Sequence, residues 1–393
     1  MVWAEFIEIS LCMESTGKYW IPVYNVLEDM ITITLANPKY IKAIKGKKTD
    51  KKDSIWIADL HRHGLVPGSF IPPHDVRKLR DLCRYRTKLV SNKSSEKNRV
   101  QNSLTMCNLA ISHVLSDTFG KTAQRIIDYV LSCETFDPEY CKTLIDGRVK
   151  ADHDEIIRSI LGYQLSLDQI TKITFAKNHL SFLDESLASL DERIFEFSEP
   201  FRHQIKLLES IPGVTSVSAT RIISEIGVDK DVFHSAKHLC SWAGLVPMNN
   251  ESAGKKKSVK ISRAGVYLKP LLVQCANAAV KSNADPYFKE KYEKIKKRRG
   301  HKKAIIAIAR MILTCSYHMI LKNEFFKPTD NTQQNAEQNQ KAMQRKLDKA
   351  MELLKLNGFS VSLDTDISNF QTVIDNSQLN GVADQISFRA VLE

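Results

Sequence analysis

The sequence predicts a small α/β unit followed by a mostly α-helical chain. Three observations support this prediction. Apolar runs read as strand, helix and strand near the start, apolar residues recur every three or four positions over 173–197, and two helical patterns flank a Pro-Gly-Val turn at 212–214. A chain of 393 residues is too long for one ordinary domain, so we expect two or three.

The first part of the chain is expected to contain parallel strands. Residues 6–13 form a mostly apolar run typical of a buried strand, residues 19–30 have a helical pattern, and residues 31–35 alternate like a second strand. Strand, helix and strand in this order indicate a parallel unit. A further helix is expected to start near Asp50 and to end before Gly64.

A long basic helix is predicted from His74 onward. Its acidic residues are only Asp75, Asp81 and Glu96. A charge run is usually a solvated face, but one that is long and mostly of one sign favours contact with phosphates, and Arg84 and Arg86 are our candidates. The basic residues of the run are Arg77, Lys78, Arg80, Arg84, Arg86, Lys88, Lys93, Lys97 and Arg99.

An apolar seam follows over residues 173–197. Its spacing of three and four is that of the core positions of a coiled coil over several heptads. Packing within one chain is the simpler alternative, and we favour slightly a coiled coil with a second copy. The seam consists of Ile173, Ala176, Leu180, Leu183, Leu187, Leu190, Ile194 and Phe197.

Residues 207–227 resemble a helix-hairpin-helix segment. A helical pattern ends at Ile211, Pro212-Gly213-Val214 form a turn, and a second helical pattern follows. Such hairpins direct backbone N–H groups and a helix N-terminus at a phosphate. The alternative is a plain turn between two helices.

The charge of the chain points to a polyanionic partner. The net charge is +12, and residues 254–303 alone hold 16 basic and 3 acidic residues. Four aromatic residues interleave with them, a pattern that suits contact with a nucleic-acid backbone and some stacking on bases. The candidate binding residues in this segment are Lys255, Lys256, Lys257, Arg263, Lys296, Lys297, Arg298 and Arg299.

We expect a cytoplasmic protein without a membrane partner. No uninterrupted apolar run reaches the length of a membrane span, since Arg310 and His318 interrupt the longest stretch. The N-terminus shows no signal peptide. The eight cysteines are scattered without a C-x-x-C pair, so we interpret them as reduced thiols in the core rather than zinc ligands.

Three carboxylates are candidate metal ligands. Glu14 follows the first expected strand, and Asp50 and Asp53 are three residues apart at the start of the expected helix, where they share a face. Carboxylates at a strand end and on a neighbouring helix can converge on Mg²⁺, which prefers oxygen ligands. The alternative is that both aspartates simply favour the helix N-terminus.

Ser252 is a candidate nucleophile. It lies in Asn-Asn-Glu-Ser-Ala-Gly, directly before Lys255, Lys256 and Lys257. Lysines beside a serine stabilise the charge on a phosphate under attack and lower the effective pKa of the hydroxyl. Taken alone, the motif is more typical of an ordinary turn than of a nucleophile.

Several ordered motifs resemble the DEDD-type transposases of bacterial insertion sequences, the insertion sequence 110 family. The N-terminal motifs are Met-Glu-Ser-Thr-Gly at 13–17, Asn37-Pro38, Lys-Thr-Asp at 48–50 with Asp53, and His-Gly-Leu at 63–65. The C-terminal motifs are Ile-Pro-Gly-Val at 211–214, Ser-Trp-Ala-Gly-Leu at 241–245 and Asn-Asn-Glu-Ser-Ala-Gly at 249–254.

The resemblance implies an RNase H-like (RuvC-like) domain whose carboxylates bind Mg²⁺, here Glu14, Asp50 and Asp53. It also implies that Ser252 attacks a DNA phosphodiester and forms a transient phosphoserine link. Members of the family use a structured bridge RNA to choose both DNA partners and act as paired dimers, so we expect DNA, RNA and a homodimer or homotetramer.

The chain departs from the family pattern at its start. The family's first aspartate lies some tens of residues before the glutamate, but only thirteen residues precede Glu14 and none is Asp. We therefore expect an N-terminally truncated chain with an incomplete metal site. The alternatives to a transposase are a nucleic-acid-binding remnant without activity and a Mg²⁺-dependent junction nuclease that does not use Ser252.

The expected domain organisation has four parts. Residues 1–73 form a partial RNase H-like DEDD domain, and residues 74–200 form the basic helix and coiled-coil region. Residues 201–327 form the C-terminal transposase domain with the serine, and residues 328–393 form a polar linker and tail, whose Gln- and Asn-rich start at 331–340 is typical of a linker.

Overall fold

The structure is a computed structural model of the chain. It describes residues 9–38, 41, 49–229, 231–247, 258, 260–282, 286–328, 344, 348 and 352, and the backbone alone at 251–252 and 255–256. The chain divides into two units, Met1–Phe326 and Lys327–Glu393. The polar tail expected over 328–393 lies almost entirely outside the described residues.

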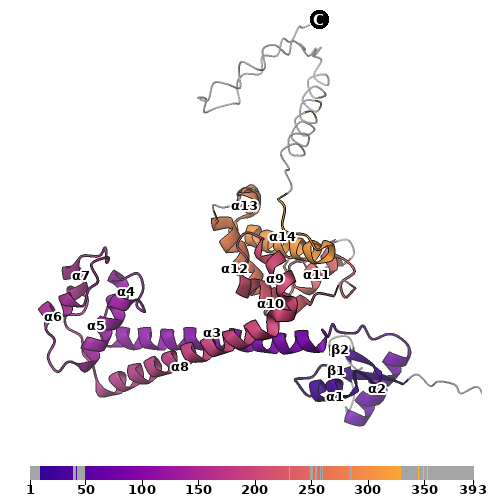
Figure 1. Cartoon of the computed structure of the whole chain (residues 1–393), viewed down its shortest axis with the longest axis horizontal. Helices are drawn as coiled ribbons and strands as arrows, with labels where there is room; N and C mark the ends of the chain where they lie inside the picture. Colours follow the sequence, from indigo (N-terminus) through magenta and orange to yellow (C-terminus); the bar gives the residue numbers. More distant parts are fainter. Residues whose placement is uncertain are drawn as a thin grey trace, which may run out of the picture. The chain divides into compact units, whose positions relative to one another are not determined.

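A parallel strand pair opens the described chain. Strand β1 (Ser10–Glu14) pairs with β2 (Thr32–Ala36) in parallel, with Glu14 opposite Ala36, and α1 (Trp20–Leu27) connects them (Figure 1). The expected order of strand, helix and strand is therefore confirmed. The RNase H-like fold implied by the resemblance is compatible with this small sheet and stays a prediction.

Helix α2 (Asp50–Arg62) begins and ends where its sequence predicts. The Thr49 side chain accepts a hydrogen bond from the backbone N–H of Lys52, an N-cap that satisfies one of the free donors of the first turn. Gly64 adopts a φ of +67° just after the last turn, and Leu65 N donates to Leu60 O to close it.

Two long helices, α3 (His74–Met106) and α8 (Leu167–Ser198), pack against each other within the chain (Figure 1). They run antiparallel, because the ion pairs between them join rising positions in α3 to falling positions in α8. These pairs are Arg86–Asp191, Lys93–Asp184 and His179–Glu96.

The apolar seam of α8 faces α3 of the same chain. Ile173, Ala176, Leu180, Leu183 and Ile194 are buried. The structure shows packing within one chain, which was the alternative, and a coiled coil with a second copy stays a prediction. Helix α3 covers the middle of the seam, Ile173 also belongs to the core of the helical subdomain and Ile194 to that of the C-terminal domain, and Phe197 is 43% exposed.

A small helical subdomain connects α3 to α8 and has its own core. Its buried residues join the end of α3 and the start of α8, as Val100 and Ile173 show, to central side chains such as Ile126 and Ile156. The sequence analysis did not single out this subdomain, because its helices are too short to show a clear periodicity. They are α4 (Ile111–Val114), α5 (Lys121–Ser132), α6 (Pro138–Thr143) and α7 (His153–Arg158).

The C-terminal part is a helical domain around a second core. Its central helix α14 is apolar enough to cross a membrane by length and composition, but it packs against α11, α12 and α13, and Ile308, Ile312 and Leu313 are buried. The elements are η1 (Glu199–Phe201), α9 (Arg202–Glu209), α10 (Ser216–Ile226), α11 (Ala236–Trp242), β3 (Glu251–Ser252), β4 (Lys255–Lys256), α12 (Leu268–Lys281), α13 (Tyr287–Arg299) and α14 (His301–Lys322).

The basic run of α3 is used inside the molecule. Arg84 donates to both carboxylate oxygens of Glu225 in α10, at 2.7 and 2.8 Å, and Glu225 is only 5% exposed. Arg86 forms a forked ion pair with Asp191. In the structure both arginines pair with carboxylates of the same chain, which offer the same bidentate geometry as a phosphate, and their contact with nucleic acid stays a prediction.

Arg80 and Arg77 complete this network. Arg80 donates to the carbonyl oxygens of Ser224 and Glu225, at 2.9 and 2.6 Å, and so caps the end of α10. Burial lowers the pKa of its guanidinium to about 10, although the negative charge of Glu225 acts in the opposite direction. Arg77 donates to Glu28, just after α1, at 2.9 Å. Helix α3 therefore holds the N-terminal unit and α10 through separate arginines.

The two helices predicted around the Pro-Gly-Val turn are present and the turn packs against α12, while its phosphate-binding role stays a prediction. Helices α9 and α10 flank a turn in which Gly213 has a φ of +82°. A Cβ added to Gly213 would lie 2.3 Å from Ala279 N and 2.6 Å from Cys275 O, so only glycine permits this contact.

We expect Gly213→Ala to destabilise the protein by about 3 kcal/mol, because a positive φ and a backbone overlap both oppose the new Cβ. Urea unfolding followed by circular dichroism measures the change. Gly300→Ala is the control, since Gly300 has a φ of +78° and no atom within 4 Å of an added Cβ. Equal losses in the two variants would contradict a packing role for Gly213.

We expect Arg84→Ala to destabilise the protein by about 2 kcal/mol, because it leaves the Glu225 carboxylate buried; the value is reduced from that of a fully buried pair since Arg84 is partly exposed. Lys88→Ala, an exposed neighbour on α3, is the control and should change little. Filter binding measures DNA affinity in parallel. A loss of DNA affinity in Arg84→Ala without a loss of folding stability would instead indicate that Arg84 contacts a phosphate.

Candidate functional site

The three candidate carboxylates lie on β1 and α2. Glu14 ends β1, is exposed and accepts a hydrogen bond from Thr16 Oγ1 at 2.8 Å. Asp50 and Asp53 lie in the first turn of α2, where the helix dipole stabilises negative charge. Asp50 is exposed and Asp53 is half-buried.

Helix α2 and β1 are in contact, and their ends are joined at one point. His61 Nε2 in the last turn of α2 lies 3.1 Å from Ser10 Oγ at the start of β1. Within the described residues, however, no group of three or more His, Cys, Asp or Glu side chains lies close enough together to hold a metal ion. The first aspartate of the family pattern has no counterpart among residues 1–13. Residues 1–8 lie outside the described residues.

Ser252 lies on a short hairpin between α11 and α12. Its backbone forms β3 with Glu251, antiparallel to β4, and Ser252 is paired with Lys255 while Glu251 is paired with Lys256. An isolated bridge joins Pro247 to Ile261 on either side of the hairpin. Ala253, Gly254 and Lys257 fall outside the described residues.

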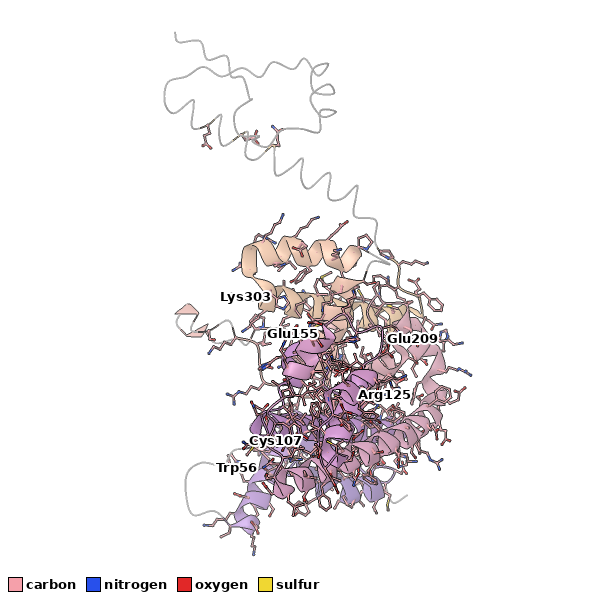
Figure 2. The ribbon with its side chains drawn as sticks, turned by 90° about the vertical axis from the view of Figure 1, so that its left-hand side faces the viewer. Trp56, Cys107, Arg125, Glu155, Glu209 and Lys303 are labelled. Carbon is pink, nitrogen blue, oxygen red and sulfur yellow. The ribbon has the colours of Figure 1, made fainter. Side chains whose placement is uncertain are left out.

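The other predicted basic residues are exposed in the C-terminal domain. Arg263 is exposed, and so are Lys296, Lys297, Arg298 and Arg299 at the end of α13. His301, Lys302 and Lys303 at the start of α14 join them, and Figure 2 labels Lys303. We call residues 296–303 the basic corner.

Local helix electrostatics explain only half of the basic corner. Cations at the end of α13 are favoured by the helix dipole, but cations at the start of α14 are disfavoured. The first turn of α14 has no acidic residue and no side-chain cap. Lys296–Glu293, at 3.6 Å, is the ion pair that the described residues form here. An arrangement that local stability does not favour is typical of a binding surface.

The charge of the described elements is segregated. Residues 74–198 hold 18 basic and 18 acidic residues, whereas residues 199–328 hold 24 basic and 10 acidic residues. The basic run of α3 is therefore balanced by acidic residues that follow it, mainly in α5–α8. A count over 74–198, rather than over α3 alone, would have shown that acidic residues balance the basic run, although the partner of Arg84, Glu225, lies beyond this range.

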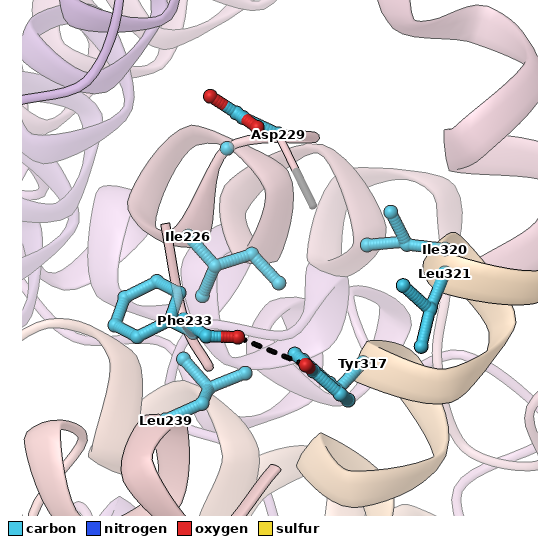
Figure 3. Close-up of a pocket in the computed structure, with 8 residues that line it drawn as sticks. Ile226, Asp229, Phe233, Leu239, Tyr317, Ile320 and Leu321 are labelled. Atoms are coloured by element: carbon cyan, nitrogen blue, oxygen red, sulfur yellow. Dashed lines mark hydrogen bonds between the residues drawn. The ribbon is translucent and has the colours of Figure 1, made fainter. Parts of the chain in front are cut away.

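A shallow apolar pocket lies away from these residues. Ile226, Phe233 and Leu239 line it together with α14, and Tyr317 donates to the carbonyl of Phe233 at 2.9 Å (Figure 3). Asp229 is the acidic residue at its rim. None of the lining residues was predicted for the site, and the pocket offers no grouping of titratable side chains.

Two family models match the chain in succession. One, described as a transposase and named for the DEDD transposases of IS110, matches residues 3–108. The other, the transposase IS116/IS110/IS902 family, matches residues 205–293. The first span contains Glu14, Asp50 and Asp53, and the second contains Ser252.

Several known proteins are similar to the chain. The pilin gene-inverting protein of Moraxella bovis is 29% identical over 39% of this chain and 49% of its own length, so the match spans about half of that relative. The transposase for insertion sequence element IS1111A of Coxiella burnetii is 24% identical over 80% of this chain and 78% of its own. An uncharacterized 44.8 kDa protein of insertion element IS116 from Streptomyces clavuligerus is 26% identical over 75% and 76%.

The order of the two family matches agrees with the order of the motifs found in the sequence, and the relatives that align over most of the chain come from insertion elements. The chain is therefore similar, in both its N-terminal and its C-terminal part, to the DEDD-type transposases of the insertion sequence 110 family.

Proposed function

We propose that the chain cuts and rejoins DNA of an insertion sequence. In this proposal Ser252 is the nucleophile, and carboxylates that bind Mg²⁺ assist the reaction. One observation carries the proposal: the two family matches enclose, in order, the carboxylates and the serine that the motifs assign. The names of the relatives add transposition and gene inversion, which are both DNA rearrangements.

The serine step is a phosphoryl transfer that conserves the number of phosphodiester bonds. Ser252 Oγ attacks a backbone phosphorus and gives up its proton, and the bond from phosphorus to the departing deoxyribose oxygen breaks. That oxygen takes up a proton and leaves a free hydroxyl, while the phosphate remains on the serine. Attack by the hydroxyl of another strand reverses the step and releases Ser252.

The lysines after Ser252 suit this step. Lys255 stands opposite the serine in the backbone register of the hairpin, and Lys256 follows it. Their positive charges would balance the negative charge that grows on the phosphate oxygens as the fifth bond to phosphorus forms.

Glu14, Asp50 and Asp53 supply the oxygen donors that Mg²⁺ prefers. From His61 back to Asp53 a helix rises about 12 Å, and from Ser10 to Glu14 a strand rises about 13 Å. His61 lies beside Ser10. A helix α2 that runs antiparallel to β1 therefore places Asp53 about as far along the strand as Glu14. When bound, Mg²⁺ would stabilise charge on the phosphate oxygens.

The basic corner and Arg263 are proposed to hold nucleic acid. The corner combines a row of exposed cations with few acidic neighbours, which suits a phosphate backbone. The partners that we propose are the DNA ends and target of the element, a bridge RNA, and further copies of the chain in a homodimer or homotetramer. Cytoplasmic action on chromosomal DNA fits these partners.

We expect the chain to form a covalent adduct with a DNA substrate at Ser252 in the presence of Mg²⁺ and RNA, and Ser252→Ala to abolish it. A denaturing gel with labelled DNA, followed by peptide mapping, measures the adduct. Ser258→Ala, in the same loop, is the control and should keep it.

Each other outcome identifies an alternative. Cleavage that survives in Ser252→Ala would point to a junction nuclease that uses the carboxylates alone. DNA binding without cleavage or adduct in the unaltered chain would point to a binding remnant.

We expect Arg298→Gln with Arg299→Gln to weaken DNA binding and to reduce the slope of log K against log salt by up to about 2, since each lost phosphate contact removes about 0.9. The slope comes from binding titrations between low and moderate salt. Arg148→Gln with Lys150→Gln, exposed in the helical subdomain, is the control. An unchanged slope in the first variant would exclude the basic corner from the interface.

A further inference from the structure

The loop that carries Ser252 is closed at its base by two glycines. Gly244 and Gly265 have φ values of +70° and +68°. A Cβ added to Gly244 would lie 2.5 Å from Ala264 O, and a Cβ added to Gly265 would lie 2.2 Å from Ala243 O. The backbones before and after the loop are thus in direct contact, and no side chain larger than hydrogen fits between them. We call residues 246–262 the serine loop.

Three hydrogen-bonding features fasten the returning end of the serine loop. Pro247 and Ile261 form the isolated bridge, and Ser262 Oγ accepts a hydrogen bond from Ala264 N at 3.2 Å. Lys269, in the first turn of α12, donates from Nζ to the carbonyl oxygen of Ser262 at 2.7 Å. Of these three features, the contact of Lys269 is the one that a side chain from outside the loop makes.

The position of Lys269 is not explained by its helix. A cation in the first turn of α12 is opposed by the helix dipole, and burial lowers the pKa of the Lys269 ammonium. Its described partner is a neutral carbonyl rather than a carboxylate. Most lysines of this domain are exposed, whereas Lys269 is half-buried with its ammonium directed to the loop. Both the helix dipole and burial therefore disfavour the positive charge of Lys269. The contact that this ammonium makes is with the serine loop, at Ser262.

We propose that Lys269 is a positioning residue for Ser252. It holds the returning end of the serine loop at Ser262, while Gly244 and Gly265 hold the two described ends of the loop together at its base. The inference rests on the proposed function, in which Ser252 is the nucleophile. Misplacing a reacting group by about 1 Å can cost on the order of a hundredfold in rate.

The first test measures the loop itself in the full-length protein. In Lys269→Met, which keeps the length of the side chain but removes the charge, amide hydrogen exchange over the serine loop should be faster by about tenfold. Lys269→Arg should restore slow exchange, since a guanidinium can donate to the same carbonyl. Lys281→Met, exposed in the last turn of the same helix, is the control and should exchange like the unaltered chain.

The second test measures the adduct at Ser252 with DNA at saturating concentration. We expect Lys269→Met to form it about tenfold or more slowly, with unchanged DNA affinity and an unchanged salt slope, and Lys269→Arg to recover the rate. A salt slope reduced by about 1, with an unchanged rate at saturation, would make Lys269 a phosphate contact and overturn the inference.

Two further results decide between this inference and the proposed function. An unaltered rate in Lys269→Met, with normal adduct formation in the unaltered chain, would overturn the positioning role alone. Absence of any adduct in the unaltered chain would overturn the proposed function, and the exchange experiment would then still show whether Lys269 fastens the loop. Equal exchange in Lys269→Met and the unaltered chain would overturn the fastening as well.

Discussion

The buried contact of Arg80 and Arg84 with the end of α10 is the constraint on which the rest of the described fold depends. Helix α3 contributes Val76, Leu79 and Cys83 to the core of the C-terminal domain and continues into the helical subdomain, so it belongs to both cores. A helix shared in this way needs its rotation fixed. The forked contact of Arg84 with Glu225 contributes to this, because two parallel hydrogen bonds require the planar guanidinium and carboxylate to face each other edge to edge.

The sequence was sufficient for the ends of α2 and for the strand pair, but not for the short helices of the subdomain or for the partners of charged residues. Thr49 and Gly64 predict the two ends of α2, and the apolar alternation predicts the parallel strands, because both signals depend on neighbouring residues. The role of Arg84 depends on Glu225, which lies 141 residues away. A charge run in one segment cannot show whether its partner is a phosphate or a carboxylate elsewhere in the chain. The same reason explains the seam of α8, whose periodicity is identical for a partner within the chain and for a second copy.

The candidate site was predicted from motifs rather than from geometry. Glu14, Asp50 and Asp53 were assigned by their spacing and by the resemblance, and the described residues place them on two elements in contact but not in one metal-binding group. The short hairpin at Ser252 gives the serine a lysine opposite in register, a relation that no spacing rule would predict with certainty. Lys269 was missed because a single lysine in a basic segment has no sequence signal; only its hydrogen bond to Ser262 distinguishes it.

Charge is distributed differently around the two hydrophobic cores. The paired helices and their subdomain are neutral as a whole, with 18 basic and 18 acidic residues over 74–198, and such a surface has little long-range attraction for a phosphate backbone. The C-terminal domain holds the excess of cations, the serine loop and the aromatic cluster in which Trp242, two residues before Gly244, meets Phe70 at 5.9 Å. Phe70 lies between α2 and α3. The segment that follows the carboxylates and the segment that precedes the serine therefore pack on one another, so the two candidate parts of the site share a fixed point in the core even though they come from opposite ends of the described chain.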